Sequence, residues 1–205
     1  MSYLFIAMFL LDTEVLLICG GLSSVTDPTA SNKCYILDKY SSRLFTTMTE
    51  KRCLAASLIT DENKLWVTGG LNYDNNLPLS STEYILKNGE SVKGPGLPHG
   101  LAAHTIIGLN STISMFIGGV IESDATDLTF YYDHVNQVWS DGPRLNVARA
   151  MHGTGIVTDL VTRERLVIVT GGQSYEAGHY GHYRSTEILI DGNWVLGNKK
   201  ARPFQ

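Results

Sequence analysis

Glycine pairs recur along this chain at nearly equal steps. The four pairs are Gly20-Gly21, Gly69-Gly70, Gly118-Gly119 and Gly171-Gly172, at steps of 49, 49 and 53 residues, and each follows an apolar run. A step of about fifty residues is typical of an array that repeats one structural unit. In such an array each unit buries its faces against its neighbours, and the loops of all units gather on a shared surface. The sequence therefore predicts one continuous repeat domain whose function lies in its loops.

The residues between successive glycine pairs predict four short strands in each unit. Two apolar strands joined by a polar turn precede each pair, at 5–11 and 15–19, 55–59 and 65–68, 104–107 and 113–117, and 152–157 and 166–170. After a variable polar stretch a third strand follows, at 34–38, 83–86, 129–133 and 187–191. A fourth strand carries an aromatic residue at Phe45, Trp139 and Trp194, whereas the second unit has Ser91 or Val92 there. No window shows a helical periodicity, so the expected class is all-β.

The paired glycines have a physical use at the end of an apolar strand. Glycine adopts a positive φ without steric cost and lets a neighbouring backbone or ring approach closely. We therefore expect all eight glycines of the four pairs, together with Trp139 and Trp194, to be structural rather than functional.

Four antiparallel strands repeated in tandem are the blades of a β-propeller. The third unit carries the fullest motif: Gly118-Gly119, Tyr132-Asp133, Trp139, Gly142-Pro143 and Arg149. This motif resembles the Kelch repeat, and the resemblance covers essentially the whole chain. It implies a Kelch-type β-propeller of four blades, with repeats at approximately 1–50, 51–97, 98–148 and 149–205. Kelch propellers usually have more blades, so we expect an incomplete or open ring whose first and last blades leave apolar faces uncovered and favour self-association.

The Kelch resemblance implies a noncatalytic module that binds a protein partner through the loops on one face. The roles it suggests are substrate receptor of a ubiquitin ligase and cytoskeletal scaffold. The richest loop spans residues 173–184, which are dense in Tyr, His and Arg, and Tyr and Arg dominate binding hot spots. The expected partner-binding residues are Arg52, Tyr73, Asn75, Glu122, Asp124, Arg149, Tyr175, His179, His182, Tyr183 and Arg184. For Arg52 and Arg149 a structural alternative stays open, in which each guanidinium group ties adjacent blades through backbone carbonyls.

Composition and motifs argue against several other functions. The 16 Lys and Arg residues are scattered and the net charge is -4, so we expect no nucleic-acid partner, and no apolar stretch suits membrane insertion. Glu176, His179 and His182 lack a further committed ligand, so we expect no metal and no cofactor. No nucleophile elbow, phosphate-binding loop or His-Glu-x-x-His motif is present. The alternative to a binding module is a secreted propeller enzyme or a carbohydrate-binding protein.

The cysteines and one sequon bear on the compartment. Cys19, Cys34 and Cys53 cannot all pair within the chain, and we expect them as small core residues in a reducing, cytoplasmic setting. The alternative is a bridge between Cys19 and Cys34, which fall on neighbouring predicted strands. The apolar run 3–11 is interpreted as the first strand, because it lacks the basic start and the cleavage site of a signal peptide. The glycosylation sequon at Asn110, in a predicted turn, favours secretion instead.

Overall fold

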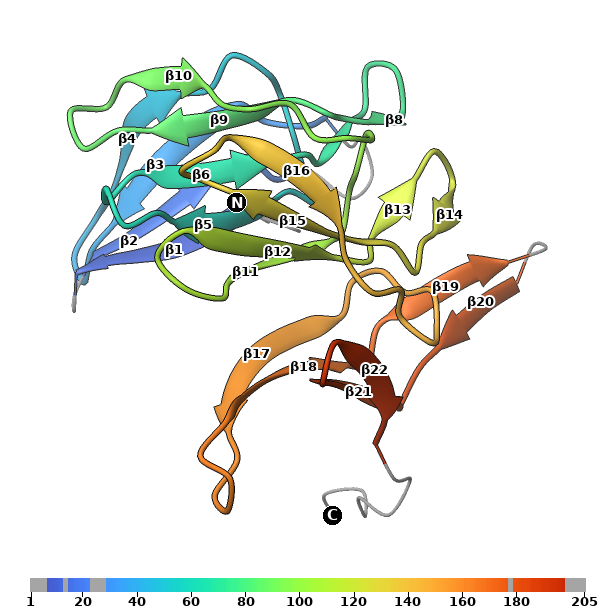
Figure 1. The fold of residues 1–205 in the computed structure, drawn as a ribbon. Coiled ribbons are helices and arrows are strands. Elements are labelled where there is room, and N and C mark those ends of the chain that lie inside the picture. The colour runs from blue at the N-terminus through green and yellow to red at the C-terminus, as the bar shows by residue number, and fades with distance from the viewer. Residues whose placement is uncertain (1–6, 13–14, 23–28, 177–178, 198–205) are drawn as a thin grey trace.

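The computed structural model describes residues 7–12, 15–22, 29–176 and 179–197 (Figure 1). These residues form strands and no helix, which confirms the all-β class. Consequently, no described helix is long and apolar enough to cross a membrane.

Sixteen of the strands form four antiparallel sheets of four strands each, which we number along the chain. Sheet 1 contains β1 (Ala7–Asp12), β2 (Val15–Cys19), β3 (Lys33–Leu37) and β4 (Ser42–Thr47). Sheet 2 contains β5 (Ala56–Ile59), β6 (Leu65–Thr68), β9 (Thr82–Ile85) and β10 (Ser91–Lys93). Sheet 3 contains β11 (Thr105–Gly108), β12 (Ile113–Ile117), β15 (Thr129–Asp133) and β16 (Val138–Asp141). Sheet 4 contains β17 (Gly153–Thr158), β18 (Arg165–Thr170), β21 (Thr186–Ile190) and β22 (Asn193–Leu196).

The predicted strands agree with the observed ones to within two residues at their ends, although residues 5 and 6 lie outside the described residues. The aromatic residues Phe45, Trp139 and Trp194 fall on the fourth strands, as expected. The agreement is best explained for the second strands of sheets 2 and 3, whose nearly continuous apolar runs are packed on both faces.

The polar stretches after the glycine pairs were predicted as loops, and in three units this is wrong. They fold into two-stranded hairpins, formed by β7 (Leu71–Asn72) with β8 (Leu77–Pro78), β13 (Val120–Ile121) with β14 (Asp124–Ala125), and β19 (Gln173–Glu176) with β20 (His179–His182). In the first unit Leu22 and Ala30 form one antiparallel bridge, and residues 23–28 between them lie outside the described residues.

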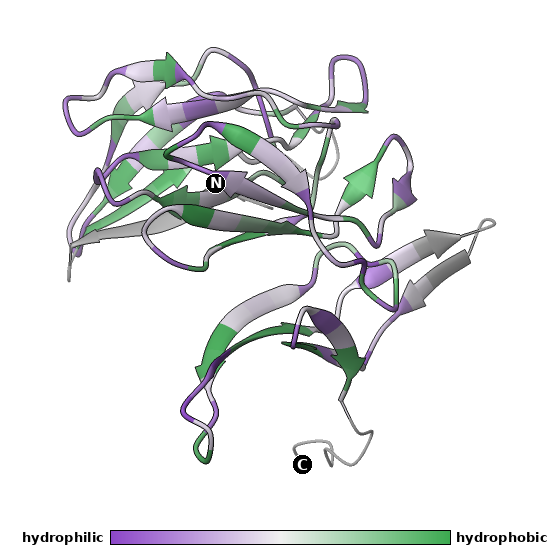
Figure 2. Ribbon diagram, viewed as in Figure 1, coloured by the Kyte–Doolittle hydropathy of each residue, from purple (hydrophilic) through white to green (hydrophobic). Residues whose placement is uncertain are grey.

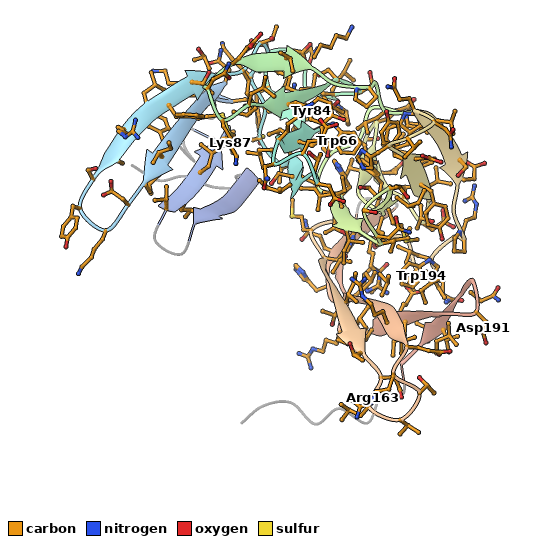
Figure 3. The ribbon with its side chains drawn as sticks, turned by 60° about the vertical axis from the view of Figure 1, so that its left-hand side comes forward. Trp66, Tyr84, Lys87, Arg163, Asp191 and Trp194 are labelled. Carbon is orange, nitrogen blue, oxygen red and sulfur yellow. A yellow bond between two sulfur atoms is a disulfide. The ribbon has the colours of Figure 1, made fainter. Side chains whose placement is uncertain are left out.

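The four sheets follow one another along an arc, with sheet 1 at one end and sheet 4 at the other (Figure 3). Their first strands, β1, β5, β11 and β17, contact each other in that order. Three apolar cores fill the spaces between successive sheets, and hydrophobic residues concentrate on the strands while hydrophilic ones occupy the turns (Figure 2). Trp66 at the centre of the second core is fully buried between sheets 2 and 3.

The glycine pairs join each unit to the next, which explains their spacing. All eight have positive φ. The amide of the second glycine donates to the residue that opens the next unit: Gly21 to the Arg52 carbonyl at 2.9 Å, Gly70 to Leu101 at 2.8 Å and Gly119 to Arg149 at 2.8 Å. A side chain on Gly119 would place its Cβ 2.7 Å from the Ala102 carbonyl oxygen, so only glycine fits there.

Cys19 and Cys34 form a disulfide, so the expectation of three unpaired cysteines is wrong for these two. The reason is their register, because they lie directly opposite each other on β2 and β3. Cys53 is unpaired and buried, as expected, and its burial raises the pKa of its thiol to about 11.

Candidate functional site

The three hairpins lie at the same end of the sheets and form what we call the hairpin surface (Figure 1). Each begins directly after a glycine pair, where the second strand of its sheet ends. Each is also fixed by a pair of backbone hydrogen bonds to the segment that links two units. The bridged residues are Cys53 with Leu71, Ala102 with Val120, and Ala150 with Gln173. Because the anchor is the same for all three, the hairpins project from the same end of the sheets, and β14 packs against β19.

The hairpin tips use residues with left-handed backbone conformations. Glu122 at the β13–β14 tip has φ 56, and Asn76 in the β7–β8 turn has φ 53. Positive φ in short hairpin loops matches the right-handed twist of the flanking strands. Asn76 tolerates this conformation well, whereas Glu122 adopts it at a cost, which makes the β13–β14 tip a strained point of the surface.

The hairpin surface carries charges of both signs. Asp74 on the β7–β8 turn and Glu122 and Asp124 on β13–β14 are exposed and acidic. Arg184, which follows β20, is exposed and basic, and His182 is exposed beside it. The surface therefore presents exposed carboxylates at Glu122 and Asp124 and an exposed guanidinium group at Arg184, while Asp74 pairs with Lys51 at 3.5 Å.

The structure brings most of the predicted site residues to this surface. Those that lie on or beside its hairpins are Tyr73, Asn75, Glu122, Asp124, Tyr175, His179, His182, Tyr183 and Arg184. The side chains of Tyr175 and His179 lie outside the described part of the structure. The others are exposed, except Tyr73 and Tyr183, which are half-buried.

Tyr183 supports the third hairpin from beneath. Its hydroxyl lies 2.6 Å from the Ser174 hydroxyl across the hairpin. Its ring also covers the Arg149 guanidinium group, whose Cζ lies 5.5 Å from the ring centroid. This cation–π contact holds the base of the hairpin against the interior of the repeat.

Arg52 and Arg149 do not belong to the surface, so the expectation that they contact a partner is wrong. Both side chains are fully buried. Arg149 donates to the carbonyl oxygens of Gly171 at 2.8 Å and Ser185 at 3.1 Å, and to the Glu187 carboxylate at 2.7 Å. A guanidinium group offers five donors in a planar fork, which suits this cluster of acceptors. The structural alternative is therefore correct as to role, but each guanidinium group binds acceptors of its own unit and does not tie adjacent blades.

The second unit repeats this buried cluster with the same residue types. Arg52 donates to the Gly69 carbonyl at 2.7 Å, the Ser81 carbonyl at 3.0 Å and the Glu83 carboxylate at 2.8 Å. Burial raises the pKa of Glu83, but hydrogen bonds from Ser91 and from the Thr49 amide, and then the Arg52 charge, outweigh it and leave this pKa below its usual value.

The sequence contained a signal for these glutamates that our site prediction missed. Both units carry Ser-Thr-Glu at the start of the third strand, at 81–83 and 185–187. The third unit replaces the whole cluster with apolar residues, because Leu101, Leu128 and Phe130 occupy the positions of the Arg, Ser and Glu. We call this position, where the segment entering a unit meets the third strand of its sheet, the joint. The joint is polar in the second and fourth units and apolar in the third.

A cleft of about 800 Å³ opens at the other end of the sheets, between sheets 2 and 3. Tyr84 and Tyr132 line it with the turns at 60–64 and 108–111. Trp66 stacks on Tyr84 at 5.6 Å beneath this wall, and burial raises the pKa of Tyr84 to about 12. This cleft was not predicted, because its lining combines residues of different units, including Arg165 of sheet 4.

His134 in the cleft wall lies 2.8 Å, through Nε2, from the Ser114 hydroxyl. Ser114 is only 1% exposed, so its hydroxyl is not open to a substrate. Burial lowers the pKa of His134 despite the acidic groups nearby. This pair stabilises the cleft wall.

The described residues contain no group of three or more His, Cys, Asp and Glu side chains placed to hold a metal ion. No family model matches the chain, and no curated protein matches it.

Proposed function

We propose that this chain is a set of Kelch-type propeller blades that acts as a noncatalytic protein-binding module through its hairpin surface. The observation that carries the proposal is the common anchoring of the three hairpins, which holds polar tips at one end of a rigid repeat. Loops held by a rigid scaffold are where binding residues concentrate.

The charges of the hairpin surface indicate the kind of partner. Glu122 and Asp124 would attract basic groups, whereas Arg184 would attract acidic ones. A folded protein offers both signs at this spacing, but a nucleic acid offers only negative charge. We therefore propose a protein partner, and propose neither a nucleic-acid partner nor membrane insertion.

The Kelch resemblance extends the proposal to two roles, substrate receptor of a ubiquitin ligase and cytoskeletal scaffold. Both roles belong to a cytoplasmic protein, so they hold only if the secretory location inferred in the next subsection is overturned. The disulfide between Cys19 and Cys34 favours the second candidate, a secreted propeller enzyme or carbohydrate-binding protein, because disulfides persist in oxidising compartments. Binding through the hairpin surface fits either compartment.

The experiment has two stages. The partner is first captured with the intact chain, identified by mass spectrometry and purified, and its Kd is then measured by calorimetry. We expect two variants, Glu122→Ala/Asp124→Ala and His182→Ala/Arg184→Ala, to weaken binding at least about tenfold each, because we place the few residues that carry most of the binding energy on these hairpins.

Matched controls come from the opposite end of the sheets. Lys87 in the β9–β10 turn and Arg163 in the β17–β18 turn are exposed charges there (Figure 3). Lys87→Ala and Arg163→Ala are expected to leave the Kd unchanged. If the controls weaken binding and the hairpin variants do not, the proposed surface is wrong.

A further inference from the structure

We infer that Asn110 accepts an N-linked glycan and that the protein folds in the oxidising lumen of the secretory pathway. The inference does not depend on the hairpin surface. Asn110-Ser111-Thr112 is the only sequence of the form Asn-x-Ser/Thr, with x other than Pro, in the chain. The inference rests on two observations, one on the turn between two strands of sheet 3 and one on the disulfide of sheet 1.

The first observation is the way the structure presents the Asn110 amide. Asn110 and Ser111 are exposed in the turn between β11 and β12. The Asn110 Oδ1 accepts hydrogen bonds from the Thr112 amide at 2.8 Å, the Thr112 hydroxyl at 3.0 Å and the Ile113 amide at 2.8 Å. All three bonds are accepted by Oδ1, and none of them uses Nδ2. The folded turn therefore accommodates a substituent on Nδ2 without losing a hydrogen bond.

The second observation is the disulfide of sheet 1. Cys19 and Cys34 are both buried and face each other across β2 and β3. Disulfides are rare in the cytosol and persist along the secretory route, where N-linked glycans are also added. A disulfide and a presented sequon thus point independently to the same compartment.

The secretory pathway supplies the reactants that both modifications need. Nδ2 of Asn110 forms a bond to C1 of an oligosaccharide carried on a lipid diphosphate; the C1–O bond breaks, the lipid diphosphate leaves, and Nδ2 loses one proton. The two thiols lose two electrons and two protons to the disulfide of a thiol oxidant, which is reduced to a dithiol.

The position of Asn110 is compatible with partner binding. The β11–β12 turn lies at the end of sheet 3 opposite β13–β14 (Figure 1). Asn110 and Ser111 also border the cleft between sheets 2 and 3. A glycan there covers the cleft mouth and leaves the hairpin surface open.

The test uses the endogenous protein, captured by antibody and treated with peptide N-glycosidase. We expect one downward step in apparent mass, and we expect Asn110 to read as Asp in the released peptide. Without reduction, denatured protein should be alkylated at Cys53 only. An unshifted endogenous protein, beside a shifted glycoprotein marker in the same sample, overturns the inference, and so does alkylation of Cys19 and Cys34 without reduction.

Tagged variants expressed in the same cells give matched controls. Asn110→Gln and Thr112→Val remove the sequon and should lose the glycosidase shift, whereas Ser111→Ala changes the same turn and should keep it. A shift that persists in Asn110→Gln places the glycan elsewhere and also overturns the inference. Thermal unfolding of each variant separates loss of the glycan from loss of the fold.

Discussion

Gly119 shows how a single backbone position sets the connection between two units. It has φ +107, and a Cβ there would lie 2.7 Å from the Ala102 carbonyl oxygen and 2.7 Å from the His104 Cβ. We expect Gly119→Val to lower the free energy of unfolding by about 2 to 4 kcal/mol, through backbone strain and overpacking. Urea denaturation measures this. Gly155→Val is the control, because a Cβ at Gly155 meets nothing within 4 Å, and an equal loss in both variants would contradict the explanation.

His104 and His152 make the stability of the fold depend on pH. Both are buried in equivalent positions, where His104 Nε2 lies 2.9 Å from the Thr68 hydroxyl and His152 Nε2 lies 3.0 Å from the Thr105 hydroxyl. Burial, and then the charge of the neighbouring His152, lowers the pKa of His104 to about 3. Burial, and then the Arg149 charge, lowers the pKa of His152 to about 4.

These pKa values fix the sign of the effect. The unfolded imidazole binds a proton near pH 6.5, whereas the folded one does not, so stability is complete above pH 6.5 and falls as the pH drops toward about 4. Each histidine contributes a loss of about 1.4 kcal/mol per pH unit in this window. Urea denaturation at pH 7.5 and 5 should show this loss, His152→Gln should reduce it, and the exposed His99→Gln should not. A pH-independent midpoint would refute the prediction.

At the scale of the element, the strands were predictable and the pieces between them were not. The second strands 65–68 and 113–117 were predicted with their observed bounds, since unbroken apolar runs ending in glycine are local signals. The hairpins were missed because β7–β8 and β13–β14 have two-residue strands, which depend on backbone bonds to Cys53 and Ala102 from the linking segments. Such anchors join residues far apart in sequence, and no local pattern records them.

The candidate site was predictable only where local sequence decides the position of a residue. Glu122, Asp124, His182 and Arg184 were found because polar residues after a glycine pair stay at the surface. Arg149 was misplaced because burying an arginine requires a set of acceptors that only the folded joint assembles. The repeated Ser-Thr-Glu was the one clue to that set.

The polar joint of sheet 4, formed by Arg149, Ser185 and Glu187, can be replaced by the apolar residues found at the same positions in sheet 3. Arg149→Leu leaves the Glu187 carboxylate buried without its charged partner, so we expect a loss of about 3 to 5 kcal/mol in the free energy of unfolding. The triple variant Arg149→Leu/Ser185→Leu/Glu187→Phe copies Leu101, Leu128 and Phe130 of sheet 3. It removes the unpaired charge and should recover a large part of that loss. Chemical denaturation of the single and triple variants measures the recovery.

The control for this swap is Arg144→Leu. Arg144 pairs with Asp127 at 2.7 Å, but its side chain is 66% exposed. An exposed pair contributes about 0 to 1 kcal/mol, so this variant should stay close to the parent protein. If the triple variant were less stable than Arg149→Leu, the equivalence of the two joints would be wrong.

At the scale of the whole molecule, the arc has two end sheets, each with a neighbouring sheet on one side, and the outer face of sheet 4 is apolar. Ile168 on β18 occupies the position of Trp66 and Met115, which are fully buried between sheets. In sheet 4 the same face carries Ile168 half-buried and Val157, Ile190 and Val195 exposed. Sheet 3 covers this face of sheet 2, and sheet 4 covers it on sheet 3. On sheet 4 the same face is left open.

We expect this face to drive self-association at micromolar concentration, because large exposed apolar patches are sites of association. Ile190→Lys/Val195→Lys places two charges on the face and should shift the weight-average mass in light scattering toward that of one chain. Val138→Lys is the control, since Val138 is similarly exposed, at 53%, but belongs to sheet 3, which is packed against sheet 4. A parent protein that stays monomeric across the concentration range would contradict the prediction, and so would association that Val138→Lys abolishes as fully as the sheet 4 variant.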